Sequence, residues 1–314
     1  MSFIGKSTSG VLDIKTQGKE IIEGVKGESV ALRAFTKLPN MTSGQHTIPV
    51  ATQLAQASFV SGDAGLKSTS IPIWEGKNIT AEEVAVVVPI SENMLKDSSY
   101  DIFGQIAPQV KEAFGRAIDS AILFGKGKPD SWQDGIVEEA IEKEKVVVAT
   151  GDLYEDIMGE DGLISKVEES GYFVDGFYSP ISMRGKLRGL RDDNKNPIFV
   201  TDMKMETSPY ALDGSPLYFN QNGVVMTDDA KLVAGDFKQA VYSIREDIDW
   251  KLFTEGVVSD NNGKVLYNLM QNDMVALRFT MRLGWALPNP VNAVDSSESR
   301  YPFAVLTSEE SGSF

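Results

Sequence analysis

The chain has 314 residues, 42% of them hydrophobic, which is long enough for two domains with buried cores. Its 45 acidic and 30 basic residues give a formal net charge of −15, which argues against a DNA-reading protein with a basic stripe. No cysteine is present, no apolar run approaches the roughly 18 residues of a membrane helix, and the start does not resemble a secretion signal. We therefore expect a protein made in a reducing cytoplasm.

Residues 1–45 are polar and rich in glycine, and they show no core-forming periodicity. A segment of this composition cannot bury enough apolar surface to fold alone. We predict an extended N-terminal arm that is ordered, if at all, by its neighbours.

Residues 46–90 predict a long antiparallel hairpin. Strand-like runs cover 47–60 and 83–90, and alternate residues of the second run are apolar from Val84 to Ile90. The stretch from Ser61 to Lys77 between them predicts a turn-rich tip. Because a projecting hairpin cannot bury both of its faces within its own subunit, it needs a partner.

The predicted hairpin tip contains the residues that we expect to contact another subunit. Trp74 is the strongest candidate, because an aromatic side chain in a polar, projecting loop is either an interface hot spot or a local staple. The set of predicted contacts is Trp74, Leu66, Lys67 and Glu75.

Residues 101–124 predict one long helix, with apolar residues recurring every three or four positions from Ile102 to Phe124. Pro108 is expected to kink it or to mark the start of its straight part, and Gly125 follows where helices often end. At about 1.5 Å per residue the helix spans about 36 Å, which is long for a compact domain.

Residues 145–255 predict a separate α/β unit. Helical patterns lie near 163–167 and 183–187, and short strands are expected at 198–200 and 216–219. Beyond this unit, Asn262 and Gly263 form a strong hairpin-turn signal.

Residues 275–287 alternate between apolar and other side chains along their whole length. This pattern predicts a single strand of roughly 43 Å, far longer than the five or six residues of a typical strand. A long strand, a long helix and a long hairpin together indicate a flat, elongated molecule suited to a lattice.

No residues make a convincing catalytic, cofactor or metal site. His46 is the only histidine and has no obvious acidic partner, so the nucleophile–base–acid arrangement of a hydrolase cannot be assembled around it. The run from Gly125 to Lys128 lacks the spacing of a phosphate loop, and Asp192 to Asn196 lacks the later residues of a calcium loop. The acidic cluster Glu138, Glu139, Glu142 and Glu144 is interpreted as a solvated segment.

Several short segments, taken in order over residues 50–295, resemble the tailed-bacteriophage major capsid family of the Hong Kong 97 type. They are Ala57–Val60, Ile79–Thr80, Val84–Ser98, Ala121–Gly127, Asp134–Ile136, Gly214–Leu217, Ala234–Phe237 and Arg282–Pro290. Each segment is degenerate, and their order and spacing make the resemblance specific.

The resemblance implies an α+β fold of the Hong Kong 97 type. Its parts would be an N-terminal arm (1–45), an extended loop hairpin (46–90), a peripheral domain (91–144 and 256–314) and an α/β axial domain (145–255). The peripheral domain would contain a spine helix at 101–124 and the long strand at 275–287.

The function that the resemblance implies is a major capsid protein without enzymatic activity. Many copies would form hexamers and pentamers that close an icosahedral head around double-stranded DNA, without sequence-specific binding and without a membrane. Assembly in the bacterial host cytoplasm would involve a portal, with a decoration protein as a further candidate partner. The arm begins almost at Met1 without a fused scaffold, so either a separate scaffolding protein assists assembly or none is needed. The alternatives are an encapsulin-like nanocompartment shell and a soluble acidic enzyme.

Some members of this family join their subunits by a bond between lysine and asparagine side chains. The resemblance makes four residues conceivable partners in such a bond: Lys67, Lys77, Asn261 and Asn262. A nearby carboxylate would be needed to promote the reaction.

Overall fold

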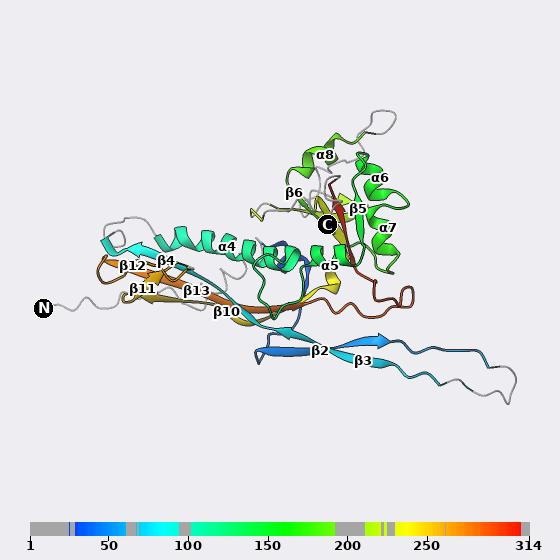
Figure 1. The fold of residues 1–314 in the computed structure, drawn as a ribbon, viewed down its shortest axis with the longest axis horizontal. Coiled ribbons are helices and arrows are strands. Elements are labelled where there is room, and N and C mark those ends of the chain that lie inside the picture. The colour runs from blue at the N-terminus through cyan, green and yellow to red at the C-terminus, as the bar shows by residue number, and fades with distance from the viewer. Residues whose placement is uncertain are drawn as a thin grey trace.

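A computed structural model describes residues 25, 29–60, 67, 69–93, 102–191, 211–220, 223–224, 230–260 and 262–308. Figure 1 shows an elongated molecule with three parts: a flat sheet with a helix lying along it, a second α/β unit at one end of that helix, and a projecting two-stranded ribbon. The expected α+β class and elongated shape are confirmed.

The flat part is a four-stranded sheet in the order β1-β10-β13-β4. Its longest strands, β10 (Val241–Phe253) and β13 (Met274–Ala286), have 13 residues each and pair antiparallel. The predicted long strand is thus confirmed. Alternate β13 side chains from Val275 to Trp285 are buried, as the period of two predicted.

Helix α4 (Ile102–Phe124) lies along this sheet and runs without a break through Pro108. Its apolar stripe, including Val110, Phe114, Ile118 and Ile122, packs in one core with the buried side chains of β13. Gly125 follows at a φ of +64°, the left-handed conformation that glycine adopts readily. The predicted long helix and its glycine end are confirmed.

The second unit is a six-stranded sheet in the order β5-β14-β9-β6-β8-β7. Alternate residues of its strands face opposite sides: Phe177 and Leu306 join a cluster with α6, α7 and α8, whereas Tyr178 and Val305 join the core beneath α4. The elements of this unit are α5 (Ile136–Glu142), β5 (Val146–Val148), α6 (Leu153–Met158), α7 (Leu163–Glu168), β6 (Gly176–Pro180), α8 (Met183–Gly189), β7 (Ala211–Leu212), β8 (Ser215–Asn220), β9 (Leu232–Gly235), a 3-10 turn (Phe237–Gln239) and β14 (Phe303–Thr307).

The strands of the two sheets do not follow the expected division into an axial domain at 145–255 and a peripheral domain at 91–144 and 256–314. Strand β10 falls within 145–255 but pairs with β13 of the four-stranded sheet, and β14 falls within 256–314 but lies between β5 and β9. The linear boundaries at 145 and 255 were therefore wrong for these strands, because pairing joins segments that are far apart in the chain. The expected strand at 198–200 lies outside the described residues.

The expectation of an unpacked arm was wrong for residues 29–45. Helix α2 (Val30–Ala34) buries its first three residues against α4, and β1 (Thr36–Lys37) pairs parallel with β10. The fully buried Asp119 of α4 accepts hydrogen bonds from Ser29 Oγ at 2.6 Å and from the Val30 and Ala31 amides at 3.0 Å each. This carboxylate thereby satisfies the free amides at the start of α2 and fastens the segment to the core.

The projecting ribbon is made of β2 (Gln45–Gln53) and β3 (Ile73–Thr80), which pair antiparallel from Gln45–Thr80 to Gln53–Ile73. The predicted second strand of the hairpin was wrong: β4 (Glu82–Ser91) turns away at Ala81 and pairs with β13. Its apolar face, Val84 to Ile90, packs into the core beneath α4, and a projecting ribbon offers no such core.

A smaller hairpin, β11 (Val257–Ser259) and β12 (Val265–Asn268), closes the far end of the four-stranded sheet. Its connecting turn contains Asn262 and Gly263, the latter at a φ of +80°, so the predicted turn is confirmed. In Figure 1 this hairpin and the β2–β3 ribbon lie at opposite ends of the molecule.

Candidate assembly surfaces

The described residues hold no arrangement that resembles an active site. His46 is an exposed residue of β2 opposite Ile79, and no group of three or more histidine and acidic side chains in the described ranges could hold a metal ion. None of the helices in that part of the chain combines the length and apolar character needed to cross a membrane. The features that demand an explanation are instead exposed surfaces.

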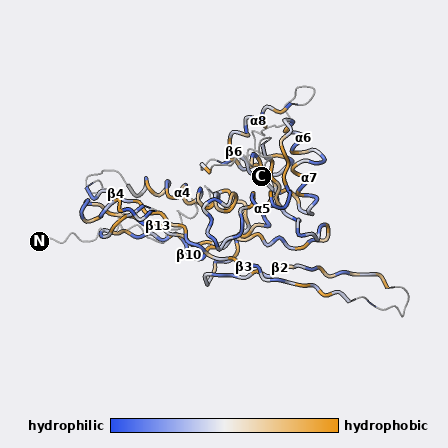
Figure 2. Tube along the Cα trace, in the orientation of Figure 1, coloured by the Kyte–Doolittle hydropathy of each residue, from blue (hydrophilic) through white to orange (hydrophobic). Residues whose placement is uncertain are grey.

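The β2–β3 ribbon is the most unusual of these surfaces. Residues 47–60 and 69–74 contain no charged side chain, although 24% of the whole chain is charged. Figure 2 shows hydrophobic positions recurring along the ribbon well beyond its contact with the body. The large apolar side chains exposed there are Leu54, Phe59, Val60, Ile71, Ile73 and Trp74.

In the part of the chain that the structure describes, β2 and β3 pair as strands only with each other, and the Val291 amide donates a hydrogen bond to the Ala51 carbonyl oxygen of β2 at 3.0 Å. Soluble proteins normally protect the edges of strands with charges, prolines or a covering element, and a lone two-stranded ribbon is at best marginally stable in water. Although β2 contains Pro49 and β3 contains Glu75 and Lys77, the stretches 47–60 and 69–74 carry no charge, so this part of the ribbon is a candidate contact surface.

The predicted contact residues lie partly elsewhere than expected. Trp74 is in strand β3 opposite Ala51, and Glu75 is opposite Val50, so neither lies at the tip of the ribbon. Trp74 is nevertheless 62% exposed, which keeps it available for a partner. Lys67 belongs to the segment of the chain that joins β2 to β3, and its side chain is exposed. Leu66 lies outside the described residues.

The base of the ribbon is fixed firmly to the body. Ile79 is fully buried, and a side chain at Gly284 of β13 would come within 2.5 Å of the Thr80 carbonyl oxygen, so only glycine allows the ribbon to cross the sheet this closely. Trp132 donates its indole N–H to that same carbonyl at 3.1 Å. The ribbon therefore leaves the body in a defined direction.

Lys77 belongs to this base and not to a free loop tip, which corrects its expected position. Its Nζ donates to the Leu287 carbonyl oxygen at 2.7 Å, and burial lowers its pKa while the neighbouring Glu139 opposes that shift. Burial in turn raises the pKa of Glu139, which accepts a 3.3 Å hydrogen bond from the buried Tyr301 hydroxyl. The expectation that Glu139 is simply solvated was therefore wrong.

A second exposed apolar surface lies at the opposite end, around β11 and β12. Asn262 is exposed in the turn of this hairpin, and Asn261 lies outside the described residues. Within one chain the β11–β12 hairpin and the β2–β3 ribbon thus lie at opposite ends of the molecule (Figure 1). The exposed large side chains here are Leu252, Val257, Val265, Leu266, Tyr267 and Met270.

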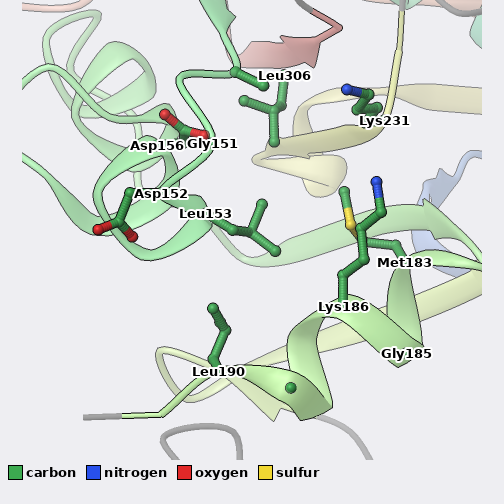
Figure 3. A pocket seen from close by; sticks show the side chains of 12 residues that line it. Gly151, Asp152, Leu153, Asp156, Met183, Gly185, Lys186, Leu190, Lys231 and Leu306 are labelled. Carbon is green, nitrogen blue, oxygen red and sulfur yellow. The ribbon is translucent and has the colours of Figure 1, made fainter. Parts of the chain in front are cut away.

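The third feature is a shallow cavity of about 730 Å³ in the six-stranded unit. Figure 3 shows Asp152 and Leu153 on one side of it, and Met183, Lys186 and Leu190 on the other. Asp156 accepts hydrogen bonds from the Thr150 amide and hydroxyl, so its carboxylate is used within the fold. Nothing in this lining pairs a nucleophile with a base, and the cavity has no catalytic character.

A flat, elongated molecule with two packed cores and a fixed projecting ribbon defines a class of protein, the shell-building subunit of the Hong Kong 97 type. The phage capsid family model matches residues 10–294, and the chain belongs to that family. The sequence expectation of this family is therefore confirmed.

Solved structures of phage capsids have the same fold. The chain is 34% identical to a protein of Microbacterium phage Oxtober96, with a TM-score of 0.76 and coverage of 90% of this chain and 91% of the other. For Mycobacterium phage Bobi the identity is 30% and the TM-score 0.74, with the same coverage. The major capsid protein of Staphylococcus phage 80alpha is 24% identical over 71% of this chain, and the match spans 65% of that relative's length.

Sequence reasoning missed two features of these surfaces. The crossing of the ribbon over Gly284 and the burial of Lys77 depend on contacts between segments some 200 residues apart. The uncharged stretch at 47–60 was readable in the sequence and would have identified the exposed ribbon directly.

Proposed function

We propose that this chain is a major capsid protein whose copies assemble into hexamers and pentamers and close an icosahedral head around double-stranded DNA. The observation that carries the proposal is the projecting two-stranded β2–β3 ribbon, which is uncharged over 47–60 and exposes large apolar side chains such as Ile73 and Trp74. A neighbouring copy supplies the surface that covers it, with Trp74 as the principal contact.

In this proposal the four-stranded sheet and α4 form the peripheral domain, and the six-stranded unit is the axial domain at the capsomer centre. The net charge of −15 suits a wall that surrounds DNA without adhering to it. Assembly takes place in the host cytoplasm, with a separate scaffolding protein and a portal as partners and a decoration protein as a further candidate.

Electron microscopy of the purified protein tests this function. Closed shells or capsomer rings of megadalton mass are the expected result, and a stable monomer or small oligomer under all conditions would overturn it. The contents of particles isolated from cells separate the two kinds of shell: DNA supports the phage head, whereas a protein cargo would indicate a nanocompartment.

A covalent link between subunits is a narrower proposal, and it requires Lys67 of one copy to reach Asn261 or Asn262 of another. Lys67 is exposed, whereas Lys77 is held at Leu287 and would have to leave that site. Boiling mature particles in detergent tests the link. A ladder of multiples of 34.3 kDa is expected if it forms, and a single band rules it out.

A further inference from the structure

The six-stranded unit carries two exposed surfaces of opposite charge that the function above leaves unused. The basic surface is helix α8 with the two residues that follow it. Residues 176–191 contain no acidic side chain, and the last eight residues of this range include four cationic side chains: Arg184, Lys186, Arg188 and Arg191. In a chain with a net charge of −15 this is a marked local excess of positive charge.

The acidic surface comprises α6 and the turn into α7. Residues 152–161 contain no basic side chain, and Asp156 is buried and bonded to Thr150. The remaining carboxylates of this stretch are exposed: Asp152, Glu155, Glu160 and Asp161.

The two surfaces do not neutralise each other within the subunit. Over the described residues, no ion pair joins Lys186 or Arg188 to a carboxylate, or Glu160 or Asp161 to a cation. The cavity of about 730 Å³ separates them, with Asp152 on one rim and Lys186 on the other (Figure 3). In Figure 1, α6 and α7 lie along one flank of the unit and α8 lies toward the other.

We propose that the basic α8 surface of one copy docks against the acidic α6–α7 surface of the next copy, forming the head-to-tail contact that closes the capsomer ring. Two different, complementary patches, here on the two rims of one cavity, suit a heterologous ring contact, since each copy offers one patch to each neighbour. The inference rests on the proposed function, because it presupposes that copies form rings.

A second copy fits the basic surface better than nucleic acid does. The complementary acidic patch is present on the same unit, with four exposed carboxylates facing a basic patch that exposes Lys186, Arg188 and Arg191, whereas the whole chain repels a polyanion through its net charge. Exposed ion pairs are individually weak and are screened by salt, but they set orientation and reject wrong pairings. We therefore expect the charges to control ring formation and its salt dependence more than subunit stability.

The experiment is a charge swap, read out by mass photometry of ring formation against protein concentration and salt. Lys186→Glu with Arg188→Glu places like charges in contact, and it is expected to raise the concentration needed for rings about tenfold or more. Glu160→Lys with Asp161→Lys should have a similar effect. Combining all four substitutions restores opposite charges in one chain and should recover rings to near the wild-type level.

A matched control separates local from overall charge. Lys37→Glu with Lys126→Glu changes the net charge as much as the α8 pair does, but at exposed positions outside the six-stranded sheet and the candidate assembly surfaces, and it should leave ring formation nearly unchanged. Thermal unfolding of each variant shows whether it folds. If either pair of substitutions lowers stability, the variant that combines all four substitutions still tests the contact, because recovery of rings requires the opposite charges to meet.

The outcomes distinguish the two proposals. If the wild type forms rings and the α8 pair forms them equally well at every salt concentration, the docking contact is wrong and the capsid function stands. Failure of the four-fold variant to recover while it remains folded also overturns the contact, as does loss of polyanion binding in the α8 pair with ring formation unaltered. A wild type that never forms rings or shells overturns both.

Discussion

The β2–β3 ribbon and the β13–α4 layer are both long, extended parts of this chain, yet they are stabilised in different ways. Strand β13 buries alternate side chains from Val275 to Trp285 beneath α4, between β10 and β4. The ribbon has no second layer along its length, and Trp74, Ile71 and Phe59 remain exposed. One region is complete within the subunit, whereas in the proposed function the other is completed by a neighbour.

This difference separates residues that determine folding from residues that determine assembly. Removing a side chain from the β13–α4 layer leaves a cavity in a packed core, which lowers the free energy of unfolding. Removing one from the ribbon changes little in the isolated subunit, because that side chain is already in water. The predictions below follow from this separation.

The largest effect is expected for Phe279→Ala. Phe279 is fully buried in β13, so its truncation should lower the free energy of unfolding by about 3–5 kcal/mol, measured by urea unfolding of unassembled subunits. Phe59→Ala in the exposed ribbon is the matched control and should change it by less than about 0.5 kcal/mol. Equal losses in the two variants would contradict the separation.

A smaller loss is expected for Asp119→Ala. This substitution leaves the buried Ser29 hydroxyl and two amides of α2 without their acceptor, which should cost about 1–3 kcal/mol of unfolding free energy. Ser29→Ala removes one cap and should cost about 1 kcal/mol. Limited proteolysis should detect earlier cleavage near residues 29–35 in the Asp119 variant, and unchanged cleavage and stability would show that α2 is not held by this carboxylate.

Trp74→Ala should separate assembly from stability. Thermal unfolding of the subunit should be nearly unchanged, while the yield of shells falls about tenfold or more, as expected for loss of an interface hot spot. Phe173→Ala removes an aromatic side chain outside the ribbon that is 83% exposed, more than Trp74, and serves as the control. An undiminished yield for Trp74→Ala would remove that residue from the interface.

The smallest effect concerns pH at the base of the ribbon. Because burial raises the pKa of Glu139 in the folded state, the folded protein binds this proton more tightly than the unfolded chain does. The stabilisation is complete below the unfolded pKa of about 4.3 and is lost as pH rises through the raised folded pKa.

Glu139→Gln removes this titration but keeps an acceptor for the Tyr301 hydroxyl. The melting temperature of Glu139→Gln relative to wild type should therefore increase between about pH 4 and pH 7. Glu142→Gln, an exposed neighbour on α5, is the control and should show no such trend. A difference that is flat with pH would show that Glu139 does not titrate as its burial implies.

The sequence by itself determined the long elements of this protein. The alternation over 275–287 and the three-to-four periodicity over 101–124 are local patterns, and each allows one backbone conformation that gathers its apolar residues on one face. The order of short family segments, read from the sequence, gave the fold and the family that the family model and the solved structures confirm. The exposure of Trp74 was also anticipated, although its place in a strand was not.

The tertiary structure decided which segments pair and which side chains become buried. Strand β2 pairs with β3 and not with β4, because only the apolar face of β4 has a core to enter, and Gly284 leaves room for the crossing between them. Asp119 accepts hydrogen bonds from the start of α2 and so holds this helix against α4. Strand β14, from the far end of the chain, lies between β5 and β9. Such choices depend on the free energy of contacts between distant residues, whereas periodicity reports only the conformation of one segment.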